Sequence, residues 1–513
     1  MSLFATKSIE ALVAEAHRQG EASLKRVLGR WDLVSLGVGA VIGAGIFVLT
    51  GQAAAAYAGP AIVLSMALAG IASALAGLCY AEFASTVPVS GSAYTYAYAT
   101  LGEFVAWIIG WDLVLEYALG AATVAVSWSG HLSSFLGQLG LQFPAPLSGA
   151  PGTVVNMAAE GPAITAVFNL PAVLVTCAVT ALLVIGVRES ATMNSAMVAL
   201  KVGVVAVVAG GGALFVQTAY WHPFIPSNAG TFGEFGWTGV LRGAAVIFFA
   251  FIGFDAVSTT AQEARNPQRD MPIGILGSLA ICTLLYMLVS GVMVGLVPYR
   301  QMLGSPAPMI VALDAAAARA SGGGHLLLSA MKLLVEIGAL AGLTSVMLVM
   351  MLAQPRIFHA MALDGLLPPW AGRIHHRWRT PHVMTIVTGI AVALAAGFTD
   401  VATLGQLVSI GTLFAFIVVS IGVLFLRKSR PELERPFRVP FMPVMPVLSI
   451  AVCLLLMASL PFATWERLVL WMAIGLVVYF TYGRHHSQLR RANEDQEIHV
   501  TVSPDGNLAG PTP

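Results

Sequence analysis

The sequence predicts an all-α polytopic membrane protein with 12 transmembrane helices, and three observations support this prediction. Of the 513 residues, 57% are hydrophobic and only 10% are charged, whereas a soluble domain has about 25% charged residues. Apolar runs of about 20 residues, the length that crosses a bilayer as a helix, recur along most of the chain. Most of the 26 Lys and Arg residues fall in alternate loops, as expected when those loops are cytoplasmic.

The apolar runs and their flanking charges place the helices in order along the chain. They are predicted at 32–57, 60–84, 103–127, 164–187, 193–217, 239–263, 273–297, 326–360, 383–398, 403–426, 442–463 and 466–483. An even number of helices puts both termini on one side, and the basic loops make that side cytoplasmic. The cytoplasmic N-terminal segment 1–31 lacks the features of a signal peptide and is expected to form an amphipathic helix. The polar tail 484–513 is expected to be cytoplasmic and disordered.

Two predicted helices carry glycine interruptions at matching depth. The first contains Gly43 and Gly45, and the sixth contains Gly253 followed by Asp255. Because five helices separate their starts, the two cross the membrane in opposite directions. Such pairs are typical of inverted repeats, with a substrate site at the breaks. The repeats are predicted at 32–217 and 238–426, followed by two extra helices at 427–483. The alternative is close helix packing, which small residues spaced four apart also favour.

Four ionisable side chains inside these helices need a reason, because a charge in a membrane span is costly. Asp112 and Glu116 lie four residues apart on one face of the third helix. We expect Glu116 to exchange a proton; the alternative is a neutral acid that makes a packing hydrogen bond. Lys201 lies in the fifth helix, where it either acts in coupling or extends its stem to the interface. Asp255 either organises the site at the break or only caps free N–H groups.

The remaining polar groups are given structural interpretations. Lys332 and Glu336, four apart on the eighth helix, are expected to form an internal ion pair. The histidines near Arg373 and at 485–486 fit basic cytoplasmic loops better than a metal site. The four cysteines lie in apolar runs without a Cys-x-x-Cys pair, which favours buried thiols. We therefore expect no metal, no cofactor and, at a net charge of +1, no nucleic-acid partner.

Seven motifs follow one another along the chain: Gly39-Ala-Val-Ile-Gly-Ala-Gly-Ile-Phe-Val, Tyr80-Ala-Glu-Phe, Pro88-Val-Ser-Gly-Ser-Ala-Tyr-Thr-Tyr, Gly110-Trp-Asp-Leu-Val-Leu-Glu-Tyr, Phe251-Ile-Gly-Phe-Asp, Glu263-Ala-Arg-Asn-Pro and Arg356-Ile-Phe-His-Ala-Met-Ala-Leu-Asp-Gly-Leu-Leu-Pro. As a set, over about residues 25–483, they resemble the amino acid–polyamine–organocation superfamily, and within it the bacterial members of the cationic amino acid transporter family. The resemblance implies a leucine-transporter-like 5+5 inverted repeat, alternating access and an amino acid substrate. It also implies that Lys201 occupies the place of a coupling sodium ion, so that transport is proton-coupled or is exchange.

The breaks predict how a zwitterion is held at mid-membrane. Free N–H groups at Ile42, Gly43, Ala44 and Gly45 face the substrate carboxylate, favoured by the helix dipole. Free carbonyl groups around Phe251, Ile252, Gly253, Phe254 and Asp255 accept the ammonium hydrogens. Proton coupling is assigned to Glu116, Lys201 and Asp255, and selectivity to Glu116 and Met347. Neighbouring Met350 and Met351 add apolar bulk.

These observations predict a secondary active transporter of L-amino acids, cationic or small and neutral, in the cytoplasmic (inner) membrane. Its partners are the amino acid, protons and the lipid bilayer. An amino acid exchanger and a sodium-coupled symporter of the same fold remain open alternatives. No catalytic set of side chains is apparent on facing helices, so an enzyme is not predicted. The sequence does not decide whether the chain binds a small membrane subunit or copies of itself.

Overall fold

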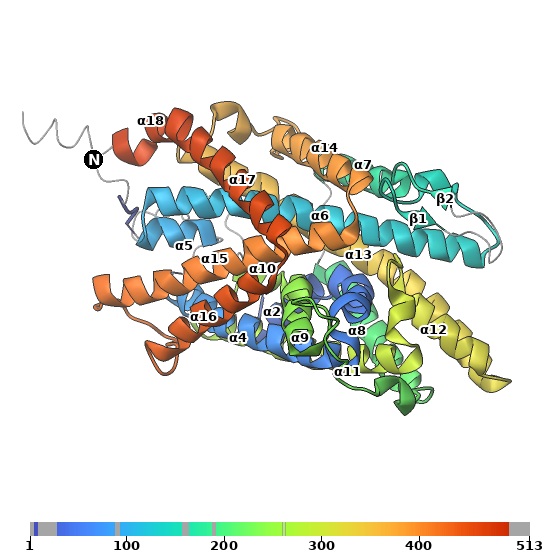
Figure 1. The fold of residues 1–513 in the computed structure, drawn as a ribbon. Coiled ribbons are helices and arrows are strands. Elements are labelled where there is room, and N and C mark those ends of the chain that lie inside the picture. The colour runs from blue at the N-terminus through green and yellow to red at the C-terminus, as the bar shows by residue number, and fades with distance from the viewer. Residues whose placement is uncertain are drawn as a thin grey trace, which may run out of the picture.

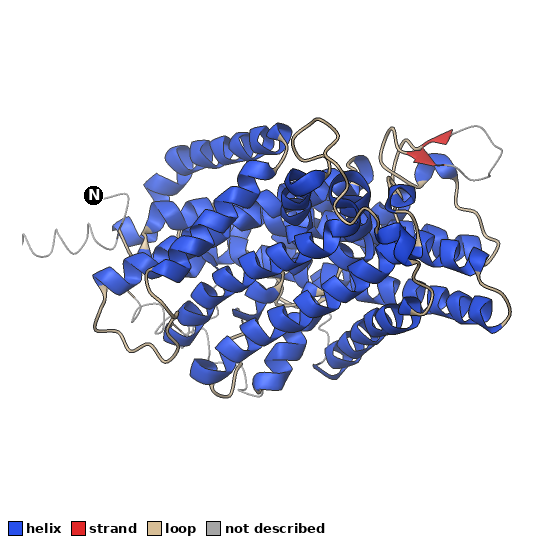
Figure 2. Cartoon of the chain, turned by 60° about the horizontal axis from the view of Figure 1, so that its bottom comes forward, coloured by secondary structure: helices blue, strands red, loops and turns tan. Residues whose placement is uncertain are grey.

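The computed structural model describes residues 5–8, 28–87, 93–155, 164–186, 191–258, 260–261 and 263–491. Within these ranges nearly all regular structure is helical (Figure 2). The exception is an antiparallel hairpin of β1 (Val154–Val155) and β2 (Ile164–Thr165), with Val154 opposite Thr165. The amphipathic helix expected before Arg30 falls largely outside the described residues.

The helices follow the predicted order, with several breaks and additions. They are α2 (Arg30–Val41), η2 (Gly45–Leu49), α3 (Thr50–Ala53), η3 (Ala54–Ala58), η4 (Gly59–Ala61), α4 (Ile62–Thr86), α5 (Ala93–Thr100), α6 (Glu103–Gln138), η5 (Ala145–Leu147), α7 (Leu170–Ile185), α8 (Ala191–Ala213), η6 (Thr218–Trp221), α9 (Gly236–Ile247), η7 (Phe248–Phe251), α10 (Phe254–Ser258), α11 (Pro267–Leu296), η8 (Tyr299–Met302), α12 (Pro308–Arg319), α13 (Gly323–Leu363), η9 (Pro369–Gly372), α14 (His382–Phe398), α15 (Val401–Ser429), α16 (Val444–Ser459), α17 (Phe462–Val478), η10 (Tyr479–Gly483) and α18 (Arg484–His486).

Apolar length defines many of these helices as membrane spans. Seven helical stretches among the described residues are long and apolar enough to cross a bilayer: Gly45–Thr86, Glu103–Gln138, Ser195–Ala213, Pro267–Leu296, Gly323–Leu363, Val401–Ser429 and Phe462–Arg491. Four shorter apolar helices occupy other predicted positions: Leu170–Ile185, Gly236–Phe251, His382–Phe398 and Val444–Ser459. The chain is therefore a polytopic helical membrane protein.

The broken helices lie in the middle of the bundle. In Figure 1, α2, α9 and α10 lie between α6 and α15 on one side and α4 and α11 on the other. The long helices α4, α6, α11, α13 and α15 form the principal packing pairs: α4 with α11, α13 with α6, and α15 with α6. The buried aromatic rings Phe47, Phe248, Phe251 and Phe254 gather at the breaks.

Both ends of the described chain meet at one end of the bundle. Lys7 Nζ lies 3.0 Å from Asp364 Oδ1, and Arg490 Nε lies 3.1 Å from Glu103 Oε1. We call this end the terminal face, and the opposite end of α6, near Gln138, the distal face. Because α6 has 36 residues, a rise of about 1.5 Å per residue makes it about 50 Å long. Figure 1 shows β1, β2 and α12 towards the distal face.

Four details of the sequence prediction are wrong. The third helix does not end at 127: α6 continues to Gln138, so part of the predicted loop 128–163 is helical. The helices α5 and α12 were not predicted, because each is too short or too polar to be recognised as a span. The tail is ordered as far as 491, where Ser487 and Arg490 are buried; residues 492–513 are outside the described residues. Cys177 is exposed, unlike the other three cysteines.

Candidate functional site

The first predicted break is present. The α-helix α2 ends at Val41, and Ile42 has an extended backbone with ψ of 101° before η2 begins at Gly45. A helix end leaves carbonyl groups without intrahelical partners, and side chains from other helices satisfy two of them here. The Gly39 carbonyl accepts from Lys201 Nζ at 2.7 Å, and the Val41 carbonyl accepts from the Tyr286 hydroxyl at 2.8 Å.

The second predicted break is also present. The α-helix α9 is followed directly by the 3₁₀-helix η7. Helical geometry is then lost at Ile252, where ψ is 140°, and at Gly253, where φ is +116°. That φ favours glycine, because other residues rarely adopt it. The Asp255 carboxylate accepts from the Gly253 N–H and from the Tyr117 hydroxyl, each at 3.1 Å. Asp255 therefore caps a free N–H group at the break, which was one of the two predicted roles. Through Tyr117 it also connects the break to α6.

The two breaks pack directly against each other. A Cβ added to Gly45 would overlap the backbone of Ala250, and one added to Gly253 would lie 2.7 Å from the Ala40 carbonyl oxygen. A Cβ on Gly43 would lie 3.4 Å from Val346 on α13. The absence of side chains at these glycines thus lets the two backbones approach closely.

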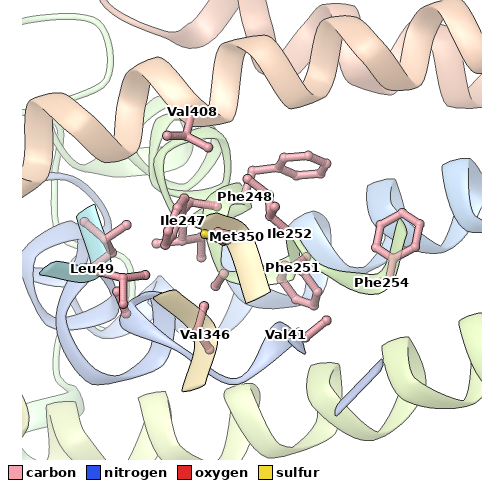
Figure 3. Close-up of a cluster of buried hydrophobic side chains, with 14 of the residues drawn as sticks. Val41, Leu49, Ile247, Phe248, Phe251, Ile252, Phe254, Val346, Met350 and Val408 are labelled. Atoms are coloured by element: carbon pink, nitrogen blue, oxygen red, sulfur yellow. The ribbon is translucent and has the colours of Figure 1, made fainter. Parts of the chain in front are cut away.

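Apolar side chains surround the paired breaks. Figure 3 shows these side chains gathered from both broken helices, from α13 and from α15, and every labelled one is buried. The labelled residues are Val41, Leu49, Ile247, Phe248, Phe251, Ile252, Phe254, Val346, Met350 and Val408. Met347, to which selectivity was assigned, is buried in α13; Met350, one turn further along, belongs to the cluster in the figure. The region therefore offers backbone polar groups in an apolar surrounding.

The two acids of α6 are buried beside the second break. Asp112 is 0% exposed and Glu116 is 2% exposed. Asp112 lies against Gly411 on α15, and Glu116 interacts electrostatically with Asp255. Among the described residues, both carboxyl oxygens of Asp112 and Oε1 of Glu116 have no hydrogen-bond partner. Burying a carboxyl group without hydrogen-bond partners is energetically costly, so these two acids are the polar side chains of α6 that most need an explanation.

Lys201 is buried between three helices. Its side chain is 1% exposed, and it runs from α8 over Gly342 of α13, where an added Cβ would lie 3.0 Å from Lys201 Cε. Its ammonium group donates to the Gly39 carbonyl just before the first break. The alternative in which the stem extends to the membrane interface is therefore wrong in this structure. The reason is that the buried Gly39 carbonyl, near the end of α2, accepts a hydrogen bond from the ammonium group within the bundle.

The predicted ion pair between Lys332 and Glu336 is also wrong. Lys332 Nζ binds Asp314 of α12 at 2.7 Å, whereas Glu336 Oε2 lies 2.9 Å from His131 Nδ1. Side chains four apart on one helix share a face, but here each has a closer partner on a neighbouring helix. His131 was missed because it lies in the part of α6 that was predicted as loop.

Other polar residues at the breaks were also missed. Tyr117 and Tyr286 donate to the break residues as described, and Ser409 Oγ of α15 accepts from the Phe249 N–H at 3.1 Å and donates to the Val246 carbonyl at 3.2 Å. A hydroxyl inside an apolar span is their only sequence signal, and it is shared by many residues that bond within their own helix. Among the described residues, no three His, Cys, Asp or Glu side chains are grouped to hold a metal ion.

Paired helix breaks in a polytopic bundle, with buried charges beside them, define the chain as a membrane carrier. The chain matches the family model described as amino acid permease over residues 28–479. It is 45% identical to the branched-chain amino acid permease BcaP of Bacillus subtilis, over 96% of this chain and 99% of the relative. It is 44% identical to the methylthioribose transporter of the same organism, over 96% of this chain and 100% of the relative.

A plant relative adds breadth to this comparison. The vacuolar cationic amino acid transporter 4 of Arabidopsis thaliana is 41% identical over 80% of this chain and 65% of the relative. The chain therefore belongs to the amino acid permease family, in the amino acid–polyamine–organocation superfamily, which confirms the resemblance stated from the motifs. It is a transport protein and not an enzyme.

Proposed function

We propose that this protein is a secondary active transporter that moves neutral L-amino acids with apolar side chains across the cytoplasmic membrane by alternating access. The observation that carries the proposal is the pair of breaks in α2–η2 and α9–α10. They place two interrupted stretches of helix in the middle of the bundle and surround their backbone groups with apolar side chains. A zwitterion with an apolar side chain matches both properties.

In this proposal the backbone binds the two charges of the amino acid. The carboxylate lies at the N–H groups around Gly43 and Gly45, where the positive end of the following helical segment favours an anion. The ammonium group lies at carbonyl groups around Phe251 and Ile252. Ala44 belongs to the first break, and Phe254 and Asp255 to the second. The Ile42 N–H, which was predicted to be free, donates to the Val38 carbonyl at 2.9 Å, so Ile42 is not part of the carboxylate site. No side-chain charge is then needed for the part that all amino acids share.

The surroundings of the breaks support an apolar side chain over a cationic one. The labelled side chains of Figure 3 are all apolar, including Val346, Met350 and Val408. The nearest acid in sequence, Asp255, already accepts from Gly253 and Tyr117. The name of the B. subtilis branched-chain permease points the same way. A cationic substrate is the second candidate, favoured by the plant relative's name and by buried Asp112 and Glu116.

We further propose that transport is coupled to protons and independent of sodium. Lys201 supplies a buried ammonium group beside the first break, and such a group repels a cation from the same carbonyl oxygens. Glu116 and Asp255 lie near enough to interact and can pass from charged to neutral as access alternates. Amino acid exchange and sodium-coupled symport are the rival mechanisms.

The same proposal includes the finer architecture. Twelve spans result if α2 to η3 form the first helix and α9 to α10 the sixth, with α4, α6, α7, α8, α11, α13, α14, α15, α16 and α17 as the others. The first ten then form a 5+5 inverted repeat. Arg427, Arg435 and Arg490 lie near the terminal face, which supports a cytoplasmic location for it.

Uptake into liposomes containing purified protein tests the proposal. We expect labelled isoleucine to accumulate when the outside is acidic, equally with sodium or potassium as the bulk cation. Excess leucine should compete, and excess arginine should not. Competition by arginine would instead support the cationic alternative. Uptake that requires sodium, or that occurs only against an amino acid loaded inside, would refute proton coupling.

A further inference from the structure

A second buried pair of ionisable groups joins α6 to α13 on the distal side of Glu116. His131 on α6 and Glu336 on α13 are both 0% exposed, and His131 Nδ1 lies 2.9 Å from Glu336 Oε2. Gln138 Nε2 donates to the other carboxylate oxygen at 3.3 Å. The second ring nitrogen of His131, Nε2, is buried with no hydrogen-bond partner among the described residues. Buried polar atoms without a hydrogen bond are uncommon in folded proteins, so this imidazole nitrogen needs an explanation.

The pair lies on the distal side of the breaks and touches the half-helix that follows the first one. His131 is 11 residues beyond Gly120, which packs against Met350, and about 1.5 Å per residue places it about 16 Å nearer the distal face. The ring of Phe47 on η2 makes an edge contact with the His131 ring, with centroids 6.0 Å apart and planes at 83°. Gly130, next in the chain, packs against Pro306 in the segment before α12.

Among the described residues, no ion pair joins His131 or Glu336 to a third charged side chain. The other charged or titratable side chains in the distal half of the elements packed here are Lys332, Asp314, Arg319, Asp400 and the exposed His325 of α13. Lys201 of α8 lies against Gly342 of α13 and donates to the Gly39 carbonyl. Lys332 binds Asp314, Arg319 Nη2 donates to the Leu296 carbonyl, and Asp400 accepts from the Thr403 N–H. η2 has no ionisable side chain, and Cys177 of α7 is exposed. With a neutral imidazole and an ionised Glu336, the pair carries one net negative charge.

We propose that His131 and Glu336 form a proton-binding switch that controls whether η2 closes the distal side of the carrier. A proton taken from water at the distal face binds the imidazole, whose Nδ1–H donates to the Glu336 carboxylate, and the pair becomes neutral overall. The imidazolium then also attracts the Phe47 ring by a cation–π interaction, whose range is about 6 Å. When the proton returns to water, the remaining negative charge favours hydration and separation of η2 from α6.

Each protonation state thus makes different contacts with η2, which a ligand-driven change of population requires. The inference rests on the proposed transport cycle for its purpose, because closing the distal side follows substrate binding in alternating access. Its test does not depend on transport. An altered contact between His131 and Phe47 would be measurable in a protein that moves no amino acid.

The test measures water access beside η2. Gln52 on α3 donates to the Ser305 carbonyl at 3.0 Å and is replaced by cysteine in a Cys177→Ala background, which removes the exposed thiol. Labelling by a membrane-impermeant maleimide is compared at about pH 6 and about pH 8, either side of the usual histidine range. Leu139→Cys, at an exposed position, is the reference thiol. The ratio of the two labelling rates removes the effect of pH on the reagent.

We expect the ratio to rise by about threefold or more from pH 6 to pH 8, within the tenfold per pH unit that one proton allows. It should be unchanged with pH in His131→Gln and in Glu336→Gln. A matched control, Lys332→Gln, removes a charge from the same helix and should keep the rise. If the His131–Glu336 contact only holds α6 against α13 and binds no proton, the labelling ratio of the parent protein will be the same at both pH values. This result would overturn the proposal.

The variants and the transport assay separate the remaining outcomes. If His131→Gln folds and keeps the parental rise, the switch is not His131 and the proposal is wrong. If neither variant gives a monodisperse protein, the labelling ratio of the parent protein alone tests the proposal. A parent ratio that does not change with pH refutes the switch. Isoleucine uptake without any pH effect on the ratio refutes this inference alone. A pH-dependent ratio in a protein that transports no amino acid refutes the proposed function alone.

Discussion

Replacing Gly253 with alanine tests whether the two breaks are packed as described. Gly253 has φ of +116°, and an added Cβ would lie 2.7 Å from the Ala40 carbonyl oxygen. The unfavourable backbone conformation costs about 1–3 kcal/mol, and the overlap with the backbone of α2 costs about 1–3 kcal/mol more. Because a backbone oxygen cannot rotate away as a side chain can, we expect Gly253→Ala to destabilise the protein by about 2–6 kcal/mol.

Two control variants separate these contributions. Gly140 has φ of +76° with open space around it, so Gly140→Ala carries the backbone cost alone. Gly45 does not have a positive φ, but a Cβ added there would overlap Ala250. Gly45→Ala therefore has the cost of the overlap without the cost of the backbone conformation. The assay is the fraction of monodisperse protein that remains after heating in detergent, measured by size-exclusion chromatography. A Gly253→Ala protein as heat-resistant as Gly140→Ala would refute the direct contact between the breaks.

Three further substitutions test the buried charges. Lys201→Met keeps the side-chain volume but removes a charged hydrogen bond worth about 1.5–3 kcal/mol, so we expect isoleucine uptake to fall about tenfold or more; unchanged uptake would exclude a coupling role. Glu116→Gln cannot exchange a proton and should flatten the pH dependence of uptake, whereas wild-type uptake at every pH would make Glu116 a packing residue. Glu82 binds Arg427 at 2.5 Å and also accepts from the Val439 N–H at 2.7 Å. Because Arg427 is 23% exposed, Glu82→Gln should cost stability near the lower end of the range of about 3–5 kcal/mol for a broken buried pair; an unchanged melting temperature would contradict this.

Apolar length allowed most of the bundle to be predicted from the sequence. A helix such as α15 (Val401–Ser429) differs from its predicted range of 403–426 by a few residues, because its apolar run is continuous and its ends are polar. The breaks were predictable for a different reason: Gly43, Gly45 and Gly253 mark places where side chains are absent in otherwise uniform spans. Helices defined by tertiary contacts, such as α5 and the distal part of α6, have no such pattern.

Contacts between helices could not be predicted from one sequence. The bonds from Tyr117 to Asp255 and from His131 to Glu336 join residues 138 and 205 positions apart. Spacing rules describe neighbours on one helix, so they paired Lys332 with Glu336 and missed both true partners. Lys201 attracted attention because a lysine in an apolar span is rare, but the choice between a buried and an interfacial position required the structure, in which the side chain reaches the Gly39 carbonyl.

The mutual contact of the two breaks has a consequence for how such proteins change over evolution. Each glycine touches main-chain atoms of the other broken helix, Gly45 at Ala250 and Gly253 at Ala40. Main-chain atoms are the same whatever amino acid occupies the position, so no substitution in the partner helix can make room for a larger residue. These two glycines are therefore fixed by the shape of the chain itself. Side-chain contacts such as those of Val346 and Met350 are not constrained in this way, because one side chain can shrink where its neighbour grows.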